Sequence, residues 1–321
     1  MDTPPGKSVC EWNVGSWVSD LTERSLVWRI VHHQLPHSGE VYDFGIEVAG
    51  SLAAGLALAE ICMAGHGNAS LVPGEIDGVG WPHVSVVTDC PVPACLLSQY
   101  AGWQIKVGRF FGMGSGPMRA AYAGEELFDR LGHREQAEQV VGVLETGRLP
   151  DADVFAHVAE KCGVAPQNVT LCVAPTASQA GNVQVVARSV ETAMHKLYEL
   201  GFDVWRVESG YGVAPLPPVA ADDMTGIGRT NDAILYGGRV TLWVRGDDDS
   251  IAETGPQVPA AASDAYGKPF LEIFEEAGRD FYKIDPHLFS PAEIVFQNLD
   301  SGRVHRFGRT NHAVLVKSFG L

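Results

Sequence analysis

Strand-like and helix-like segments alternate along this chain, and this alternation restricts its fold more than any other feature. VSVVTD (84–89) and NVTLCVA (168–174) are short apolar runs typical of strands, whereas residues 50–65 and 183–200 are longer and helical. Small-residue loops at 112–119 and 175–182 each lead into a helix. Repeated strand–loop–helix units predict an α/β fold, with ligands at the loops that follow the strands.

The length of 321 residues allows two domains. We expect two α/β lobes with mixed sheets, residues 1–165 and 166–321, and leave open that the lobes interleave. The helix ends LFDRLGH (127–133) and LYELGFD (197–203) are alike, which weakly supports an internal duplication.

Other elements follow from local pattern. WQIKVGRFF (103–111) is expected as a strand ending in a glycine loop, GMGSG (112–116), with a helix starting after Pro117. Downstream we expect a helix at 269–278 and irregular chain at 251–263. Strands are expected at 230–244, with a hairpin at Gly237-Gly238, and at 292–299 and 313–320.

The formal net charge of −16 argues against a nucleic-acid partner, because an acidic surface repels phosphates. The longest apolar run, residues 48–65, contains Glu60 and is too short to span a bilayer, so no membrane association is expected. No secretory signal is recognised, which predicts a cytoplasmic protein.

The cysteines are expected to be reduced core thiols; they are Cys10, Cys62, Cys90, Cys95, Cys162 and Cys172. DCPVPAC (89–95) lacks the second cysteine pair that a zinc site needs. In HHQLPH (32–37), His32 and His33 are adjacent and Pro36 interrupts the spacing to His37. We therefore expect no metal.

GMGSGPMR (112–119) could present backbone N–H groups to an anion or a carbonyl, with Arg119 adding charge. It lacks the Gly-Lys-Ser/Thr ending of a P-loop and the glycine spacing of a dinucleotide-binding loop. A plain tight turn is an equally good interpretation.

VARSVETAMHKL (186–197) places Arg188, Glu191 and His195 on one helical face, nearly opposite an apolar stripe. Taken alone, this pattern favours an exposed ion pair worth a few tenths of a kcal/mol. In GRTNDAIL (228–235), Asn231 and Asp232 could match the donors and acceptors of a pterin-like ring, but a turn is favoured on pattern alone.

Several long motifs together resemble the methenyltetrahydromethanopterin cyclohydrolases. They extend from about Asp43 to the C-terminus and include residues 78–120, 174–203, 226–238 and 266–293. The resemblance implies an enzyme of one-carbon metabolism that interconverts the methenyl and formyl forms of tetrahydromethanopterin by adding or removing water. It implies two α/β lobes with the pterin between them, a homotrimer, and neither a metal nor a redox cofactor.

The family's catalytic arginine and glutamate correspond to Arg188 and Glu191 here, whereas His195 gains no role. The resemblance and the loop patterns together give these expected substrate-binding residues: Lys106, Gly114, Ser115, Gly116, Arg119, Ser178, Asn231 and Asp232. Met118 and Phe44 stand where the family tends to have alanine and cysteine, which leaves the shape of the pocket open. The alternatives are a non-catalytic pterin-binding or scaffolding relative, and the same reaction on tetrahydrofolate. The latter uses a different fold.

Overall fold

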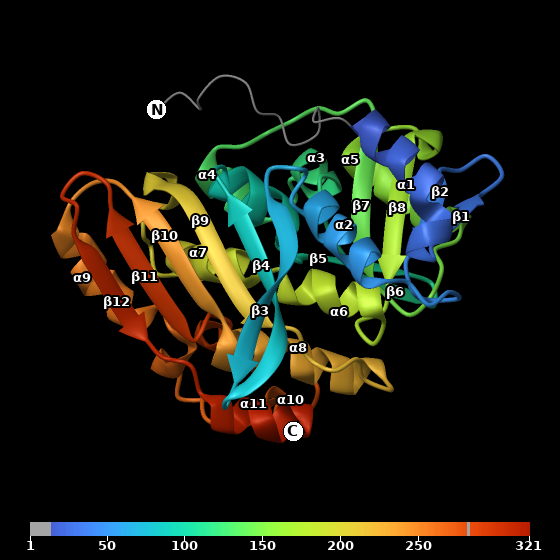
Figure 1. The fold of residues 1–321 in the computed structure, drawn as a ribbon. Helices are drawn as coiled ribbons and strands as arrows, with labels where there is room; N and C mark the ends of the chain where they lie inside the picture. The colour runs from blue at the N-terminus through green and yellow to red at the C-terminus, as the bar shows by residue number, and fades with distance from the viewer. Residues whose placement is uncertain (1–13, 281–282) are drawn as a thin grey trace. The chain divides into compact units, whose positions relative to one another are not determined.

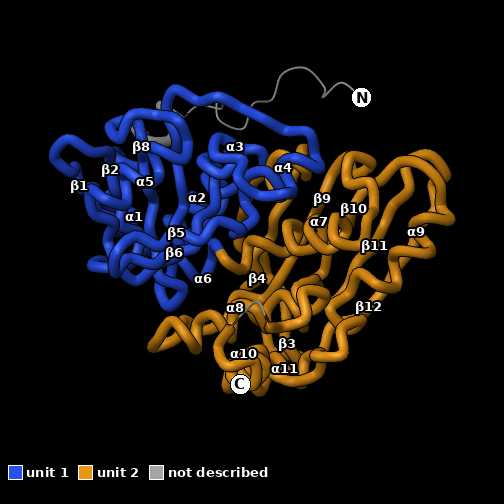
Figure 2. Tube along the Cα trace, turned by 180° about the vertical axis from the view of Figure 1, so that it is seen from behind, with its two compact units in different colours: residues 1–66, 96–184 blue, residues 67–95, 185–321 orange. Residues whose placement is uncertain are grey.

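The computed structural model describes residues 14–280 and 283–321, which form two compact units (Figures 1 and 2). Unit 1 comprises residues up to 66 together with 96–184, and unit 2 comprises 67–95 and 185–321. The expected lobe boundary at residue 165 therefore falls inside unit 1. The units interleave because residues 67–95 leave the N-terminal half of the chain to join the C-terminal half.

Unit 1 contains a six-stranded mixed sheet with the order β1-β2-β8-β7-β6-β5. Strands β2, β8 and β7 are parallel neighbours, and the outer pairs are antiparallel. The strands are β1 (Val31–Gln34), β2 (Glu40–Asp43), β5 (Trp103–Val107), β6 (Phe110–Ser115), β7 (Val140–Glu145) and β8 (Val169–Ala174).

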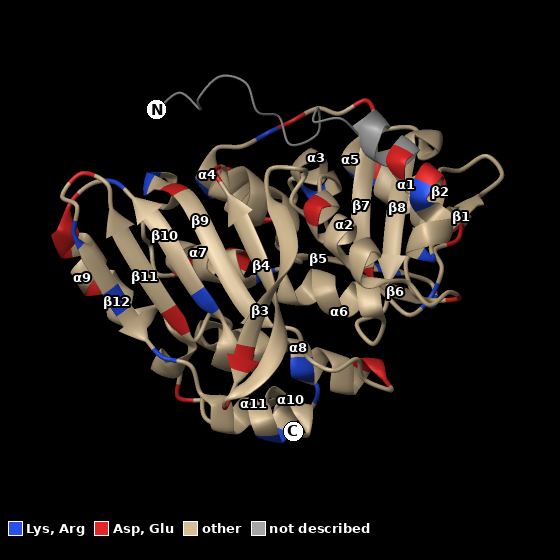
Figure 3. Cartoon of the chain, viewed as in Figure 1, with Lys and Arg blue, Asp and Glu red and all other residues tan. Residues whose placement is uncertain are grey.

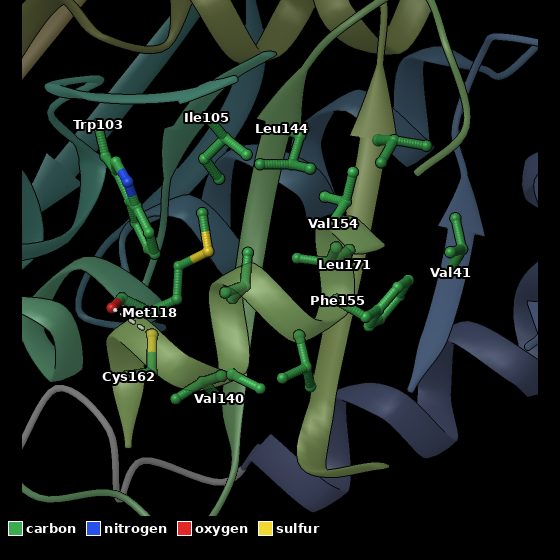
Figure 4. Close-up of a cluster of buried hydrophobic side chains, with 14 of the residues drawn as sticks. Val41, Trp103, Ile105, Met118, Val140, Leu144, Val154, Phe155, Cys162 and Leu171 are labelled. Atoms are coloured by element: carbon green, nitrogen blue, oxygen red, sulfur yellow. Dashed lines mark hydrogen bonds between the residues drawn. The ribbon is translucent and has the colours of Figure 1, made fainter. Parts of the chain in front are cut away.

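Both faces of this sheet are buried, and alternate residues of its central strands face opposite cores. Along β8, Leu171 and Val173 join one core, whereas Cys172 and Ala174 join the other. The first core, drawn in Figure 4, includes Val154 and Phe155 of helix α5. This double burial explains why the strands read as continuous apolar runs in the sequence.

The helices of unit 1 begin and end at recognisable caps. Ser51 caps α2 by accepting a hydrogen bond from Ala54, and Asp151 caps α5, which ends at Gly163 in the left-handed region. They are α1 (Val14–Trp28), α2 (Leu52–Cys62), α3 (Met118–Tyr122), α4 (Glu126–Leu131), α5 (Ala152–Cys162) and α6 (Gln179–Val186), with a short 3₁₀ turn, η2 (Pro166–Asn168). A π-helix, η1 (Val92–Gln99), carries the chain from unit 2 back into unit 1.

Unit 2 contains a second six-stranded mixed sheet, with the order β12-β11-β10-β9-β4-β3. Only β10 and β11 are parallel. Helices α7 and α8 pack against β9, and α10 and α11 pack on α8 (Figure 1). The strands are β3 (Asn68–Ile76), β4 (Val79–Thr88), β9 (Val207–Pro215), β10 (Arg239–Val244), β11 (Glu293–Asn298) and β12 (Val304–Gly308).

The helices of unit 2 are α7 (Ser189–Glu199), α8 (Asp223–Gly237), α9 (Asp248–Thr254), α10 (Phe270–Glu276) and α11 (His312–Phe319). Short 3₁₀ turns are η3 (Val204–Arg206), η4 (Gly255–Gln257), η5 (Ala260–Ala262) and η7 (Pro286–Leu288). The expected mixed α/β class is confirmed in both units.

Three expectations about the local structure of unit 2 were wrong, in whole or in part. Within the strands and hairpin predicted at 230–244, the part up to Gly237 is helix α8, whose first turn Asp222 caps through Thr225, and only the strand after Gly238, β10, is confirmed. The predicted strand at 313–320 is helix α11, whose apolar side packs on α8. The segment 251–263, expected to be irregular, contains the end of α9 and two 3₁₀ turns.

Each cysteine that the structure describes is a free thiol, and all but Cys90 are buried; Cys10 lies outside the described residues. Charged residues lie mainly on helices, in loops and at strand ends (Figure 3). Within residues 14–280 and 283–321, every helix falls short of the length and apolar character that crossing a bilayer requires.

Candidate active site

Arg188 and Glu191 lie at the start of helix α7, just after a break in the helical chain. The sequence predicted one helix over 183–200, but the structure divides it into α6 and α7. Arg188 donates its N–H to Val185 rather than to the residue four positions back, so the chain turns more tightly there. Arg188 occupies the N-cap position, and Glu191 falls in the first helical turn.

The face that carries this pair is buried. Arg188 is 7% exposed and Glu191 4% exposed, so the interpretation of this face as a solvated ion pair was wrong. Val190 and Leu197 of the opposite stripe are also buried, as the periodicity predicted. Charged groups are rarely buried in a protein without a specific role or partner, so amphipathic packing alone does not account for this face.

His195 lies one turn further along α7 and has a different environment. It is only partly buried, its Nε2 lies 3.7 Å from Oε1 of Glu199, and its ring contacts Tyr198. These are ordinary contacts along a helix surface, in agreement with a structural role.

Cys95 is a neighbour of Glu191 that the sequence reasoning missed. Its thiol is fully buried in unit 2, and burial together with the negative charge of Glu191 raises its pKa well above the usual range. Cys95 therefore stays a neutral thiol beside the carboxylate. The pattern DCPVPAC was considered as a metal motif and as a pair of core thiols, and neither interpretation indicated this contact.

The expected glycine loop is mostly strand. Gly114 and Ser115 pair with β7 as part of β6, and only Gly116, with φ of +86°, has the left-handed conformation that favours glycine. The Ser115 hydroxyl lies 3.1 Å from Cys62 Sγ and donates to the carbonyl of Val143. A substrate-binding role for residues 114–116 stays a prediction.

Arg119 has a structural environment that argues against its expected contact with an anionic ligand. Its side chain is fully buried in unit 1, and two of its nitrogens donate to Glu125 at 2.9 and 2.7 Å. A third donates to the carbonyl of Leu96 at 3.0 Å, and the guanidinium lies over the rings of Tyr100 and Phe128. The positive charge of Arg119 is thus neutralised by Glu125 within unit 1.

The other expected ligand residues of unit 1 lie apart from one another. Ser178 donates to the carbonyl of Pro175 and accepts from the N–H of Gly181, which shapes the turn into α6. Lys106 is exposed on β5. Their contact with a substrate stays a prediction.

Asn231 and Asp232 were expected to contact the heterocycle, but both make hydrogen bonds within unit 2. Asn231 donates to the carbonyl of Ile227. Asp232 is 1% exposed and accepts from the N–H of Phe270 at 2.8 Å and from the hydroxyl of Ser318. Asp232 therefore connects helices within unit 2. Both of its carboxylate oxygens accept internal hydrogen bonds, and the side chain is not exposed to a ligand.

Glu145 and Thr176 form a polar pair that the sequence reasoning did not select. Glu145 ends β7, Thr176 follows β8, and the threonine hydroxyl donates to the glutamate. Both lie at the carboxyl ends of parallel strands, where α/β folds bind ligands. A charged residue that ends a buried apolar strand was the signal available in the sequence.

One group in the described part of the chain brings together residues of metal-ligand type. Single ligand atoms of His33, Asp43 and Glu47 lie within 4.8 Å of one another. The Asp43 carboxylate already accepts hydrogen bonds from the N–H groups of Gly45, Ile46 and Glu47, which accounts for its burial without an ion.

The chain matches the family model described as Cyclohydrolase (MCH) over residues 10–319. It belongs to this cyclohydrolase family. It is similar to the methenyltetrahydromethanopterin cyclohydrolase of Rhodopirellula baltica, with 49% identity over 98% of this chain and 94% of the relative. The enzymes of the same name from Methanospirillum hungatei and Methylobacillus flagellatus are each 42% identical over 94% of this chain, covering 95% and 93% of their own lengths.

Two residues that depart from the pattern expected of the cyclohydrolase family lie in the cores of unit 1. Met118 is fully buried against β7, where Gly142 leaves space for it, and its carbonyl accepts a weak hydrogen bond from Cys162 (Figure 4). Phe44 is fully buried in the core on the other face of the sheet. Both departures are therefore changes in core packing.

Proposed function

We propose that this protein interconverts methenyltetrahydromethanopterin and 5-formyltetrahydromethanopterin, with Glu191 and Arg188 as its catalytic pair. Membership of the family and the names of its relatives support the reaction. The observation that carries the assignment of residues is the burial of both charges at the start of α7, on a face that periodicity alone would leave in water.

Glu191 acts as the general base in this proposal. The methenyl carbon bridges two nitrogens and carries delocalised positive charge, so it is electrophilic without a Lewis acid. As water attacks, Glu191 takes one of its protons, and the oxygen forms a new bond to the carbon. One carbon–nitrogen bond of the resulting carbinolamine then breaks. The departing nitrogen receives the proton from Glu191, and the formyl group remains on the other nitrogen.

Arg188 keeps Glu191 ionised and oriented in the same proposal. The two residues are three positions apart, which places them on neighbouring parts of the first turn of α7. A guanidinium stays protonated at any working pH, so it favours the charged form of a nearby carboxylate. The cationic substrate carbon adds to this effect when it is bound.

Glu191→Gln tests the base, because glutamine is nearly isosteric but cannot accept the proton. We expect loss of the methenyl chromophore to slow by about 10²–10⁴-fold while substrate affinity is largely kept. Glu199→Gln is the matched control, since Glu199 lies two turns along the same helix and is exposed. Turnover of Glu191→Gln within a few-fold of the wild type would show that Glu191 is not the base.

Arg188→Gln tests the partner and also the non-catalytic alternative. The proposal expects slower turnover with a pH–rate profile shifted toward higher pH, because Glu191 would protonate more readily without the guanidinium.

A purified wild-type protein that binds the methenyl substrate without hydrolysing it would instead support a binding or scaffolding relative. Competition between the tetrahydromethanopterin and tetrahydrofolate substrates distinguishes the carriers.

We further propose a cytoplasmic homotrimer that needs no cofactor. The free buried thiols of the described chain support a reducing compartment. The trimer rests on the resemblance, and light scattering would measure it as three times the chain mass of 34.4 kDa. The chemistry above requires no metal or redox group, so turnover should survive dialysis against a chelator.

A further inference from the structure

We propose that Gly210 and Gly212 are positioning residues for the reaction, because their missing side chains set how closely the first turn of α7 lies on β9. This inference rests on the proposed role of Glu191, which that first turn carries. We refer to the contact of Gly210 and Gly212 with Ser189 and Val190 as the glycine seat.

The distances at the glycine seat leave no room for a side chain on the strand. A Cβ at Gly212 would lie 2.3 Å from Ser189 Oγ and 2.9 Å from Val190 Cγ2. A Cβ at Gly210 would lie 2.7 Å from Val190 Cγ1. Carbon atoms in normal contact are about 3.5–4.0 Å apart, so either methyl group would push the helix away from the strand.

The pattern of β9 places both glycines on the same face of the sheet. Gly210 and Gly212 are two residues apart, and Tyr211 between them points to the opposite face, where it is 39% exposed. Glycine weakens a strand because it is flexible and contributes no packing. The close approach of α7 therefore accounts for two glycines on one face of this strand.

The far end of α7 has a separate contact, which resists relief of strain at the glycine seat by sliding of the whole helix. Lys196 is buried, and its Nζ donates to the carbonyl of His287 at 2.7 Å. A helix fixed at Lys196 and pushed outward at Ser189 must tilt about its far end. The displacement is then largest in the turn that holds Arg188 and Glu191.

This geometry matters because general-base catalysis depends on a short and aligned path for the proton. Displacing a catalytic group by about 1 Å can cost about 10²-fold in rate even when substrate binding survives. The glycine seat should therefore affect kcat more than KM.

The test compares Gly212→Ala with Gly212→Ala/Ser189→Ala, using Ser189→Ala as the background. The Ser189 hydroxyl makes no hydrogen bond within the described residues. Its removal therefore relieves the nearest clash and breaks no hydrogen bond among those residues. We expect Gly212→Ala to lower kcat about 10–100-fold, with KM within about three-fold of the wild type. The double variant should recover at least part of kcat. Gly80→Ala, on β4 of the same sheet with open space at its Cβ position, is the matched control and should leave kcat unchanged.

Folded protein is verified by circular dichroism before each assay. If Gly212→Ala does not fold, Gly210→Ala paired with Val190→Ala replaces it. Wild-type kcat in the alanine variant, or a loss that the second change does not relieve at all, would overturn the glycine seat. The result is separable from the proposed base: inactive Glu191→Gln with fully active Gly212→Ala rejects only the seat, whereas active Glu191→Gln rejects the base.

Discussion

The hydroxyl of Ser318 donates a hydrogen bond to the carboxylate of Asp232, which joins the C-terminal helix α11 to α8. The other carboxylate oxygen accepts from the N–H of Phe270 and so also holds the start of α10. Burial raises the pKa of Asp232 to about 7, against these two hydrogen bonds, which lower it. One residue thus joins three helices and titrates near neutrality.

Asp232→Asn should make the stability of unit 2 less dependent on pH. The pKa of the aspartate is raised in the folded state, so its stabilising effect is greatest at low pH and is lost as pH rises toward 7. Relative to the variant, the wild type should lose roughly 2 kcal/mol of unfolding free energy between pH 5 and pH 8. Urea titrations at the two pH values measure this difference. An equal change in unfolding free energy between pH 5 and pH 8 for both proteins would contradict the assignment.

Lys196→Met should reveal the opposite pH dependence of the unfolding free energy to that of Asp232. Burial lowers the pKa of the lysine to about 8, so the folded state is penalised at neutral pH, and the penalty disappears as pH rises from about 8 to 10.5. The wild type should therefore gain roughly 2 kcal/mol relative to the variant between pH 7 and pH 10. The same denaturation series measures this, with Lys317→Met on the exposed face of α11 as a control that should show no such change.

Arg119→Met should destabilise unit 1 strongly. It would leave Glu125 without its paired nitrogens and the carbonyl of Leu96 without the guanidinium donor, a loss of about 3–5 kcal/mol for a buried pair. The exposed pair of Arg130 and Glu126, at 2.6 Å, provides the comparison. Arg130→Met should cost less than about 1 kcal/mol. Similar melting temperatures for the two variants would show that burial of the Arg119 pair has no energetic consequence.

Gly142→Ala should be destabilising alone and less so when Met118 is shortened. A Cβ at Gly142 would lie 2.2 Å from Met118 Sδ and 3.0 Å from Leu171 Cδ2. Gly142→Ala should cost about 1–3 kcal/mol through overpacking, and Met118→Ala about 2–5 kcal/mol through a cavity. Since the added methyl partly fills that cavity, the double variant should be more stable than the sum by at least about 1 kcal/mol. Strict additivity would indicate that the core adjusts around the methionine.

Periodicity predicted the buried strands and several helices well. Strands β7 and β8 are buried on both faces, so their sequences are continuous apolar runs that are easily recognised. Periodicity failed at 230–237 and 313–320, where β-branched residues lie in helices α8 and α11, which stabilise each other by packing together. The overlooked signal was Asp222, a residue that favours helix starts.

The candidate site shows the same division. Spacing placed Arg188 and Glu191 on one helical face, but periodicity assigned that face to solvent, since burial of a polar face depends on contacts distant in the sequence. Asn231, Asp232 and Arg119 were chosen for their polarity, and all three side chains make hydrogen bonds within their own unit. Polarity alone does not distinguish a ligand contact from a satisfied core group.

The departure of residues 67–95 into unit 2 has a consequence during protein synthesis. Strand β4 pairs with β9, whose first residue is 119 positions beyond the last of β4. At ribosomal rates of about 5–20 residues per second, the β3–β4 hairpin would wait roughly 6–24 s for that partner. Meanwhile the last strand of unit 1 would already have emerged, leaving an unpaired strand edge in the nascent chain. The interleaved order thus exposes the edge of this hairpin for longer during synthesis than a sequential order of the two units would.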